Sequence, residues 1–421
     1  MPKSILKKVI VSKQIHSSEF LKFMPAREKK ELLEQAFELR GKRVVHVNAT
    51  AAGGGVAEIL KSLIPYLRSL GVQADWYSIN PEVGKEFFTV TNKIHNALQG
   101  AAVKITSPEW AEYQRVNKQI ADDLDKIDCD VLVINDPQPL LAGSYSHPGK
   151  AKIYFSHIDT SAAFMPVWKK IFPVISSYRK IVFSNRSFVS GGLPRRKIKV
   201  FTPAIDPLAS KQKIITRKEA RHYLKNEGDI PPACPLVAQI SRFDVWKNPM
   251  GVIQAFRMVE NMYPEARLAL VGFNEAKDNP AAAAVHKDVA AVAGNSKDIF
   301  IFFDPKGKNI AEFTVMTQNA ADIIVQNSTK EGFGLTVAEA MWKRQPVIGG
   351  PASGIRKQIQ NGKNGFIVKT PEELAEKVIF LLSHPKKRKA MGKAARKTVL
   401  QKFLFPRLVL DHFKLYKSCL K

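Results

Sequence analysis

The sequence has few cysteines and no long apolar segment. Cys129, Cys234 and Cys419 lie far apart, so they cannot form a local zinc knuckle, and their odd number argues against a disulfide framework. No apolar run approaches the ~20 residues that a membrane-spanning helix needs. The N-terminal segment opens with basic residues, but Lys13 and His16 interrupt the residues that follow, so the apolar core of a signal peptide does not form. We therefore expect a soluble, cytoplasmic protein.

Acidic residues are also scarce. The chain has 38 Asp and Glu against 65 Lys and Arg, which gives a net charge of +27. Residues 385–421 carry much of this excess, because Asp411 is their only acid. Such a balance suits nucleic acid, an anionic membrane, a site for phosphorylated substrates or a solvated basic face. The run Lys386–Lys389 is more typical of a solvated face, so charge alone does not decide the function.

The length of 421 residues predicts two or three domains, and the pattern indicates two doubly wound α/β domains with parallel sheets. Strands are expected at 43–48, 74–79, 131–135, 151–155 and 180–184, then at 236–240, 267–272, 299–303, 323–326 and 346–348, with helices at 56–70, 248–262 and 335–343. We predict an N-terminal domain over 1–210, a second over 211–398, and a C-terminal helix over 399–421 that crosses back to the first. Ligands of such folds lie beyond the carboxyl ends of the strands, and the default site is the cleft between two such domains.

A glycine-rich loop, NATAAGGGVAE, follows the first expected strand. Its three glycines let the backbone approach a bound group and expose N–H groups at the start of the next helix. The loop matches neither GxGxxG nor GxxxxGK[ST], so nucleotide binding through those motifs is not supported. A βα turn without a ligand is the alternative interpretation.

Two cations follow the first strand of the second domain, in the segment SRFDVWKNP. Arg242 and Lys247 combine a guanidinium fork with an ammonium group, which suits a diphosphate whose charge grows as it leaves. In a chain with so many cations the pair could also be two surface residues. Their position at a strand end favours the phosphate role.

The segment EGFGLTVAE follows the strand expected at 323–326. Gly332 and Gly334 allow a tight loop, and the N–H groups of Leu335 and Thr336 open a helix whose start can bind an anion. Glu331 lies in the loop and Glu339 lies in the helix, so two carboxylates could reach one ligand. The alternative is a helix acid at the surface and a loop acid that favours the helix dipole.

These features together resemble the retaining glycosyltransferases of family 4, which have the GT-B fold of two Rossmann-like domains. Within that family the sequence is most similar to trehalose synthases of the glycosyltransferring type, which join glucose from a nucleotide-glucose to free glucose. The similarity extends over residues 42–370 and rests on the segments NATAAGGGVAEIL, NDPQP, HIDTS, PAIDPL, SRFDVWKNP and NSTKEGFGLTVAEAMWK. The loop at 349–355 departs from the family pattern, which leaves the donor or acceptor preference open.

The resemblance implies roles for individual residues. Arg242 and Lys247 would hold the donor diphosphate and stabilise the leaving group, with Glu331 beside the donor glucose. The other residues implied in donor binding are Gly54, Gly55, Gly272, Gly334, Leu335, Thr336 and, on the ribose hydroxyls, Glu339. His157 would contact the transferred glucose near C6 and join Arg242, Lys247 and Glu331 in the catalytic set. The acceptor side would comprise Asn48, Asp136, Gln138 and His157. For His157 the alternative is a structural histidine at a strand end, and for Asp136 a turn former before Pro137.

A site whose counter-charges are cations and helix-start amides needs no metal or other cofactor, although stimulation by Mg²⁺ is compatible with it. The two Asp-x-Asp triplets, at 123–125 and 128–130, precede the strand at 131–135. They lie at its amino end, away from a site at the carboxyl end, and we interpret them as helix-end and turn acids.

The expected reaction is a retaining, reversible glucosyl transfer from ADP-glucose or UDP-glucose to free glucose, giving trehalose. Another family 4 activity, such as a trehalose phosphorylase or a transferase with a different acceptor, is the first alternative. A basic protein that binds nucleic acid or a membrane surface is an alternative of another class, although no recognised motif supports a specific partner of either kind. A homodimer is compatible with the wide surface of such folds.

Overall fold

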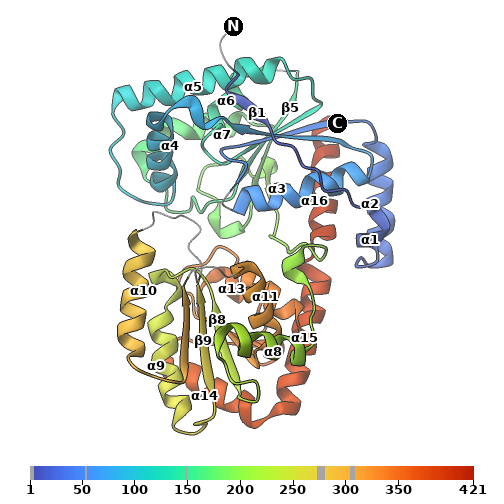
Figure 1. The fold of residues 1–421 in the computed structure, drawn as a ribbon. Coiled ribbons are helices and arrows are strands. Elements are labelled where there is room, and N and C mark those ends of the chain that lie inside the picture. Colours follow the sequence, from blue (N-terminus) through green and yellow to red (C-terminus); the bar gives the residue numbers. More distant parts are fainter. Residues whose placement is uncertain (1–3, 53–54, 148, 273–279, 304–308) are drawn as a thin grey trace. The chain divides into compact units, whose positions relative to one another are not determined.

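Two β-sheets form the centres of two separate units in the computed structural model, which describes residues 4–52, 55–147, 149–272, 280–303 and 309–421. The first unit comprises Met1–Thr202 and Pro406–Lys421, and the second comprises Pro203–Phe405. Figure 1 shows the helices and strands of each unit. The α/β architecture expected from the alternating pattern is confirmed.

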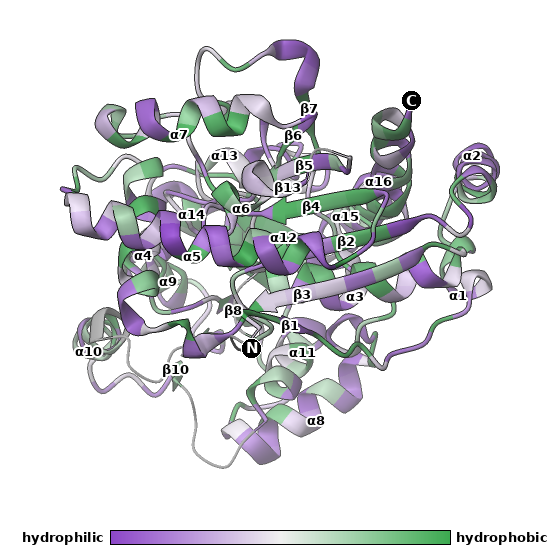
Figure 2. Ribbon diagram, turned by 90° about the horizontal axis from the view of Figure 1, so that it is seen from above, coloured by the Kyte–Doolittle hydropathy of each residue, from purple (hydrophilic) through white to green (hydrophobic). Residues whose placement is uncertain are grey.

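The sheet of the first unit has seven strands in the order β1-β3-β2-β4-β5-β6-β7. Their bounds are β1 (Leu6–Lys8), β2 (Arg43–Asn48), β3 (Gln73–Ile79), β4 (Val131–Asn135), β5 (Ala151–Ser156), β6 (Lys180–Phe183) and β7 (Ile198–Val200). All neighbours are parallel except β1, which runs antiparallel to β3 at the edge. Strand β4, in the interior of the sheet, is buried along its whole length and is apolar from Val131 to Ile134 (Figure 2), because helices cover both faces of a parallel sheet.

Side-chain alternation decides which helices cover each face of this sheet. Val45 and Val47 of β2 belong to a core shared with helices α4 to α7, whereas His46, between them, reaches Tyr416 of the last helix, α16. The helices of this unit are α1 (Ser17–Leu21), α2 (Ala26–Glu38), α3 (Gly55–Ser69), α4 (Lys85–Leu98), α5 (Ser107–Asp125), α6 (Leu140–Tyr145), α7 (Met165–Ser177) and α16 (Phe405–Leu420), with short 3₁₀ turns at Pro81–Val83, Arg186–Phe188 and Arg195–Lys197.

The sheet of the second unit has six parallel strands in the order β10-β9-β8-β11-β12-β13. The strands are β8 (Leu236–Ile240), β9 (Arg267–Gly272), β10 (Ile299–Phe303), β11 (Ile323–Gln326), β12 (Val347–Gly349) and β13 (Gly365–Ile367). The helices are α8 (Arg217–Gly228), α9 (Pro249–Glu260), α10 (Pro280–Ala293), α11 (Ile310–Ala320), α12 (Leu335–Trp342), α13 (Ser353–Arg356), α14 (Pro371–Ser383) and α15 (Pro385–Lys402), with 3₁₀ turns η4 (Ser210–Gln212) and η5 (Val245–Lys247). A core on one face joins α9, α10 and α14 to the sheet.

The C-terminal segment differs from the single helix expected over 399–421. Residues up to Lys402 complete α15, and a new helix, α16, begins at Phe405. Pro406 explains the break, because proline has no N–H for the hydrogen bond that would continue the first helix. Instead, the Ile205 N–H donates to Phe403 O at 2.9 Å, and the Phe405 N–H donates to Ile205 O at 2.9 Å.

Helix α2, in a segment for which the sequence showed no motif, is attached to α16 by ion pairs. Lys414 Nζ lies 2.7 Å from Glu31 Oε1, and Lys417 Nζ lies 2.5 Å from Glu38 Oε1. Asp123, in the first Asp-x-Asp triplet, has a structural role. Asp123 Oδ2 accepts from the Ile5 N–H at 2.7 Å and so holds the edge strand β1. The interpretation of this acid as structural is confirmed.

One buried carboxylate joins three elements of the second unit. Asp322, just before β11, is 4% exposed; it accepts a hydrogen bond from Arg221 Nη2 of α8 at 2.8 Å and forms an ion pair with Arg388 Nη2 of α15, also at 2.8 Å. It also contacts Arg217 and accepts from the Leu236 N–H at 3.0 Å. Burial opposes ionisation, but the hydrogen bond from Arg217 and its neighbours hold the pKa of Asp322 below its usual value. Arg388, from the basic run expected to be solvated, is therefore part of the packing.

Candidate active site

The loop after β8 holds the two predicted phosphate-binding cations in different environments. Asp244 caps η5 through a 2.9 Å hydrogen bond from the Trp246 N–H, which turns the chain so that Lys247 points inward. Arg242 is about half exposed, with Nη2 3.9 Å from Asp244 Oδ2, whereas the Lys247 side chain is only 14% exposed. Arg242 is therefore accessible to solvent, with a long ion pair, whereas Lys247 is largely enclosed and directly paired.

Lys247 and Glu331 form a direct ion pair through Nζ and Oε2. The loops that carry them come from β8 and β11, which are neighbours in the sheet. A second link joins the same loops, because the Thr329 N–H donates to Trp246 O at 2.8 Å. The structure therefore brings together two residues that the sequence placed in one site from segments 84 positions apart.

Glycines at the same end of the sheet permit close packing. Gly334, the N-cap of α12, has a φ of +81°, and a Cβ there would lie 3.1 Å from Glu331 Cγ. Helix geometry leaves the N–H groups of Leu335 and Thr336 without intrahelical acceptors. At the end of β9, a Cβ on Gly272 would lie 2.0 Å from the ring of Phe243. In this structure Gly272, predicted to bind the donor, leaves room for that ring.

Glu339 lies on the buried side of α12 and is 8% exposed. Its carboxylate accepts from Gln212 Nε2 at 3.3 Å and from Gln318 Nε2 at 3.4 Å, and it lies 3.4 Å from Lys211 Nζ. Four polar side chains from three parts of the second unit therefore converge. The sequence predicted Glu339 but none of its partners.

The first unit brings Asp136 and His157 together at the ends of the adjacent strands β4 and β5. Asp136 has a φ of 62°, and its Oδ1 accepts from the His157 N–H at 2.8 Å. Burial raises the pKa of Asp136 to about 7, and this backbone hydrogen bond partly offsets the effect. His157 Nε2 lies 3.1 Å from Asn135 Oδ1, and the imidazole stacks on the ring of Phe155 with 4.3 Å between the ring centroids. Burial, aided by His412, lowers the pKa of His157 to about 3, so the ring is neutral at physiological pH.

The other predicted residues of the first unit lie nearby in the chain but differ in availability. Asn48 is buried at the end of β2, where its Oδ1 accepts from Trp76 Nε1 at 2.7 Å and its Nδ2 donates to Thr50 O at 2.7 Å. The Gln138 side chain is partly exposed, and its backbone oxygen accepts from Asn117 Nδ2 at 3.1 Å. Gly55 is exposed as the first residue of α3, and Gly54 lies outside the described residues.

Comparisons with known proteins agree with this arrangement. A family model described as the N-terminal domain of trehalose synthase matches residues 46–190, and one described as glycosyl transferases group 1 matches residues 221–398. The trehalose synthase of Rubrobacter xylanophilus is 37% identical over 93% of this chain and 94% of its own length. That of Pyrococcus horikoshii is 36% identical over 93% of both chains.

The chain belongs to the trehalose synthase family. It is a glycosyltransferase, and its activity is trehalose-related glycosyl transfer. A trehalose phosphorylase of Grifola frondosa is more distant, with 26% identity over 82% of this chain and 52% of its own length.

Solved structures confirm the predicted GT-B fold. A glycosyltransferase from Rickettsia africae superposes with a TM-score of 0.68 at 19% identity and covers 90% of this chain and 99% of its own. An α,α-trehalose-phosphate synthase from Burkholderia vietnamiensis gives 0.69 at 14% identity, covering 90% and 98%. At such low sequence identity, these matches establish the fold alone.

A buried histidine cluster, which the sequence did not predict, lies beside Asn135 and His157. The ring of His412 in α16 stacks on that of Phe155, with a distance of 5.9 Å between the ring centroids, and its centroid lies 6.3 Å from that of His46. His46 Nε2 in turn lies 2.9 Å from the Tyr416 hydroxyl oxygen. Burial lowers the pKa of His412 to about 4. Residues of α16 follow those of β5 by more than 200 positions, so no local pattern signals the contact. The segment NDPQP did include Asn135, the partner of His157.

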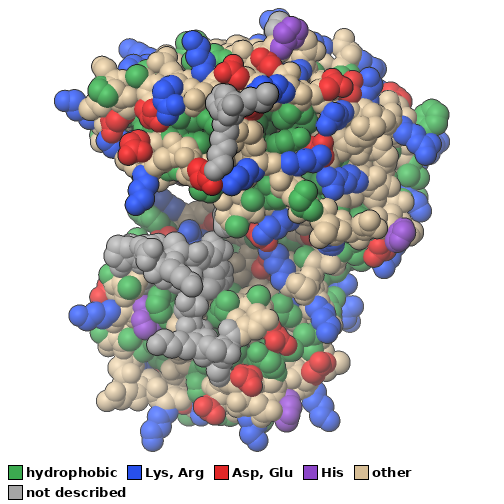
Figure 3. Space-filling view, turned by 45° about the horizontal axis from the view of Figure 1, so that its top comes forward, with side chains coloured by type: hydrophobic (Ala, Val, Ile, Leu, Met, Phe, Trp, Pro, Cys, Tyr) green, Lys and Arg blue, Asp and Glu red, His purple; other side chains and the backbone are tan. Residues whose placement is uncertain are grey.

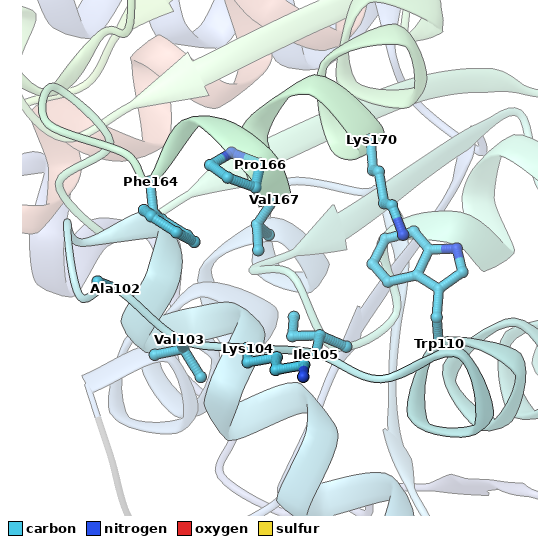
Figure 4. A pocket seen from close by; sticks show the side chains of 9 residues that line it. All are labelled: Ala102, Val103, Lys104, Ile105, Trp110, Phe164, Pro166, Val167 and Lys170. Carbon is cyan, nitrogen blue, oxygen red and sulfur yellow. The ribbon is translucent and has the colours of Figure 1, made fainter.

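A separate apolar hollow of about 440 Å³ opens in the first unit (Figure 4). Val103, Ile105, Phe164 and Val167 line it, and the ammonium of Lys170 lies 5.0 Å from the Trp110 ring centroid at its rim. None of the predicted site residues lines this hollow.

The basic residues of the C-terminal segment are partly used in internal contacts. Arg396 lies 4.2 Å over the Trp342 ring and donates to Trp342 O at 3.1 Å, and Arg407 donates to Thr202 O at 2.5 Å. On the face shown in Figure 3, Lys and Arg side chains are dispersed among acidic and apolar ones. Across the described ranges, no helix is long and apolar enough to cross a membrane, and no cluster of His, Cys, Asp and Glu could hold a metal ion.

Proposed function

We propose that the enzyme transfers glucose from ADP-glucose or UDP-glucose to free glucose and so forms trehalose, with retention at the transferred anomeric carbon. The observation that carries this proposal is the grouping of Arg242, Lys247 and the start of α12 at the carboxyl end of the second sheet. Two cations and free helix-start amides suit a leaving diphosphate, and Glu331 and Glu339 supply acceptors for sugar hydroxyls.

In the proposed reaction the bond between glucose C1 and the β-phosphate oxygen breaks, and an anomeric hydroxyl oxygen of the acceptor bonds to C1. The acceptor proton passes to the departing diphosphate. Lys247 and the amides of Leu335 and Thr336 stabilise the negative charge that develops on that leaving group. Such stabilisation is usually the largest single contribution to catalysis of this kind.

On the acceptor side, Asp136 in its ionised form accepts a hydrogen bond from an acceptor hydroxyl. Neutral His157, held by Asn135 and Phe155, contacts the transferred glucose. The buried Asn48 supports the loop that follows β2. These roles extend to this chain what the family resemblance implied, and the contacts described above are compatible with them.

A product assay tests the proposal. Purified enzyme is incubated with glucose and with ADP-glucose or UDP-glucose, and trehalase is used to cleave any non-reducing disaccharide that forms. Formation of a trehalase-sensitive product with either donor supports the proposal and assigns the donor base. Absence of product with both donors, while nucleotide-sugar binding is still measurable, would refute free glucose as the acceptor.

A phosphorylase is the second candidate, because trehalose phosphorylases are among the relatives. Incubation of trehalose with inorganic phosphate or with ADP or UDP separates the two activities. Cleavage of trehalose that requires inorganic phosphate, and not ADP or UDP, would show that the enzyme is a phosphorylase and that a nucleotide-sugar is not its donor. The homodimer and the cytoplasmic location stay predictions, the first of which analytical ultracentrifugation can test.

A further inference from the structure

Lys343 is an unusual feature of the second unit, because its buried ammonium shares two glutamine partners with Glu339. The residue directly follows α12 and is 5% exposed. Burial lowers the pKa of Lys343 to about 8, and Glu339 counteracts the effect, so the charged form still predominates at pH 7. A buried ammonium is costly unless acceptors surround it.

Three oxygen atoms surround this ammonium. Lys343 Nζ donates to Gln318 Oε1 at 2.7 Å, to Lys211 O at 2.7 Å and to Gln212 Oε1 at 3.4 Å. Gln318 is fully buried and Gln212 is 2% exposed. Protein oxygens therefore provide partners for all three N–H groups.

The same two amides reach Glu339 with their other ends. Gln212 Nε2 donates to Glu339 Oε1 and Gln318 Nε2 to Glu339 Oε2. An ammonium has donors and no acceptor, so it fixes the oxygen of each amide toward itself and the NH₂ group toward the carboxylate. Without this cation, either amide could turn and place its oxygen against Glu339.

We propose that Lys343 is a positioning residue for donor binding, which acts through Gln212 and Gln318 to orient the carboxylate of Glu339 toward the ribose hydroxyls of the nucleotide-sugar. Glu339 Oε1 receives the Gln212 amide and lies 3.4 Å from Lys211 Nζ, whereas Oε2 receives only the Gln318 amide among these contacts and so keeps a lone pair for a ligand hydroxyl. The inference rests on the proposed role of Glu339 as the residue that holds the donor ribose.

Calorimetric titration of the full chain at pH 7 tests this role. The ligands are ADP and UDP, each compared with its 2′,3′-dideoxy analogue, which lacks the ribose hydroxyls. In the wild type we expect roughly tenfold or greater preference for the hydroxylated form, because hydrogen bonds to a charged group are strong. Lys343→Met removes the donors and keeps the chain length. It should lose most of this preference by weakening the hydroxylated ligand only.

Unchanged affinity of Lys343→Met for the dideoxy ligand shows that the variant is folded, which a general structural defect would not allow. Lys389→Met, which replaces an exposed lysine of α15, is the matched control and should keep the preference. Gln318→Met is the second variant, because it removes one oriented amide without burying or removing a charge. Gln318→Met should also lose preference for the hydroxylated nucleotide.

If Lys343→Met keeps the full preference for the hydroxylated nucleotide, the positioning role is refuted. If that variant does not fold, the same result for Gln318→Met refutes it. A wild type without any preference for the hydroxylated ligand instead refutes the assignment of Glu339 to the ribose. The two failures are therefore distinguishable.

Discussion

Acidification is expected to inactivate the enzyme through Asp136. If this carboxylate accepts a hydrogen bond from the acceptor hydroxyl, only the ionised form is competent. The pKa of Asp136 is raised to about 7 by burial, so at pH 6 roughly one-tenth of the molecules and at pH 5 roughly one-hundredth carry the carboxylate. The kcat/KM for glucose should fall about tenfold per pH unit below 7.

The neighbouring histidines should not produce this limb of the profile. The pKa of His157 is lowered to about 3 and that of His412 to about 4, mainly by burial, so both are neutral where Asp136 titrates. Asp136→Asn keeps the size of the side chain, and asparagine tolerates the positive φ at this position. The variant should be slower at pH 8 and show no further loss between pH 8 and 5.

The assay measures kcat/KM for glucose from pH 5 to 9 at saturating donor, for wild type, Asp136→Asn and the control Asp128→Asn, which alters an exposed acid at the amino end of the sheet. The control should retain the wild-type profile. An acid limb near pH 7 that persists in Asp136→Asn, or a flat wild-type profile, would refute the reasoning.

Three further predictions concern charge. Arg242→Ala or Lys247→Ala should each reduce turnover about 10²-fold, since each removes a cation from the leaving group; near-normal turnover in both contradicts the diphosphate assignment. Asp322→Asn should lower the free energy of unfolding by about 3 kcal/mol at pH 7 in urea denaturation, because buried arginines lose their carboxylate. The lowered pKa of Asp322 means that this contribution is present above its unfolded pKa of about 4 and is lost as the pH falls through its folded pKa, so wild type and variant should converge in acid. Replacing Lys386 and Lys389 by serine should leave glucosyl transfer unchanged; steeply salt-dependent RNA or vesicle binding that this change abolishes would support the alternative class.

Local patterns predicted much of the fold. The bounds of β2, β8, β9, β10 and β11 coincide with those expected from apolar runs, because a strand buried on both faces has a distinctive composition. The edge strand β1 was not expected, since its three residues carry no such signal and Asp123, far along the chain, holds it in place. The break before Pro406 could have been expected from the proline itself.

The contacts of the candidate site likewise include some that strand order predicts and others that it does not. Asp136 and His157 follow consecutive strands, so their meeting could be inferred from strand order. Lys247 and Glu331 follow the first and fourth strands of the second unit, β8 and β11, which are neighbours in the usual strand order of this fold. Gln212 and Lys343, in contrast, lie 131 positions apart, and no spacing rule relates them.

The sequence by itself determined the two doubly wound sheets, the glycines at their carboxyl ends and the charged residues that follow them, because these depend on local periodicity and on strand order. Only the tertiary structure decided that Lys343 donates to two amides that also contact Glu339, that Arg388 pairs with a buried carboxylate, and that burial raises the pKa of Asp136. Burial and hydrogen-bond partners set these properties, and both arise from packing between segments that are distant in the chain.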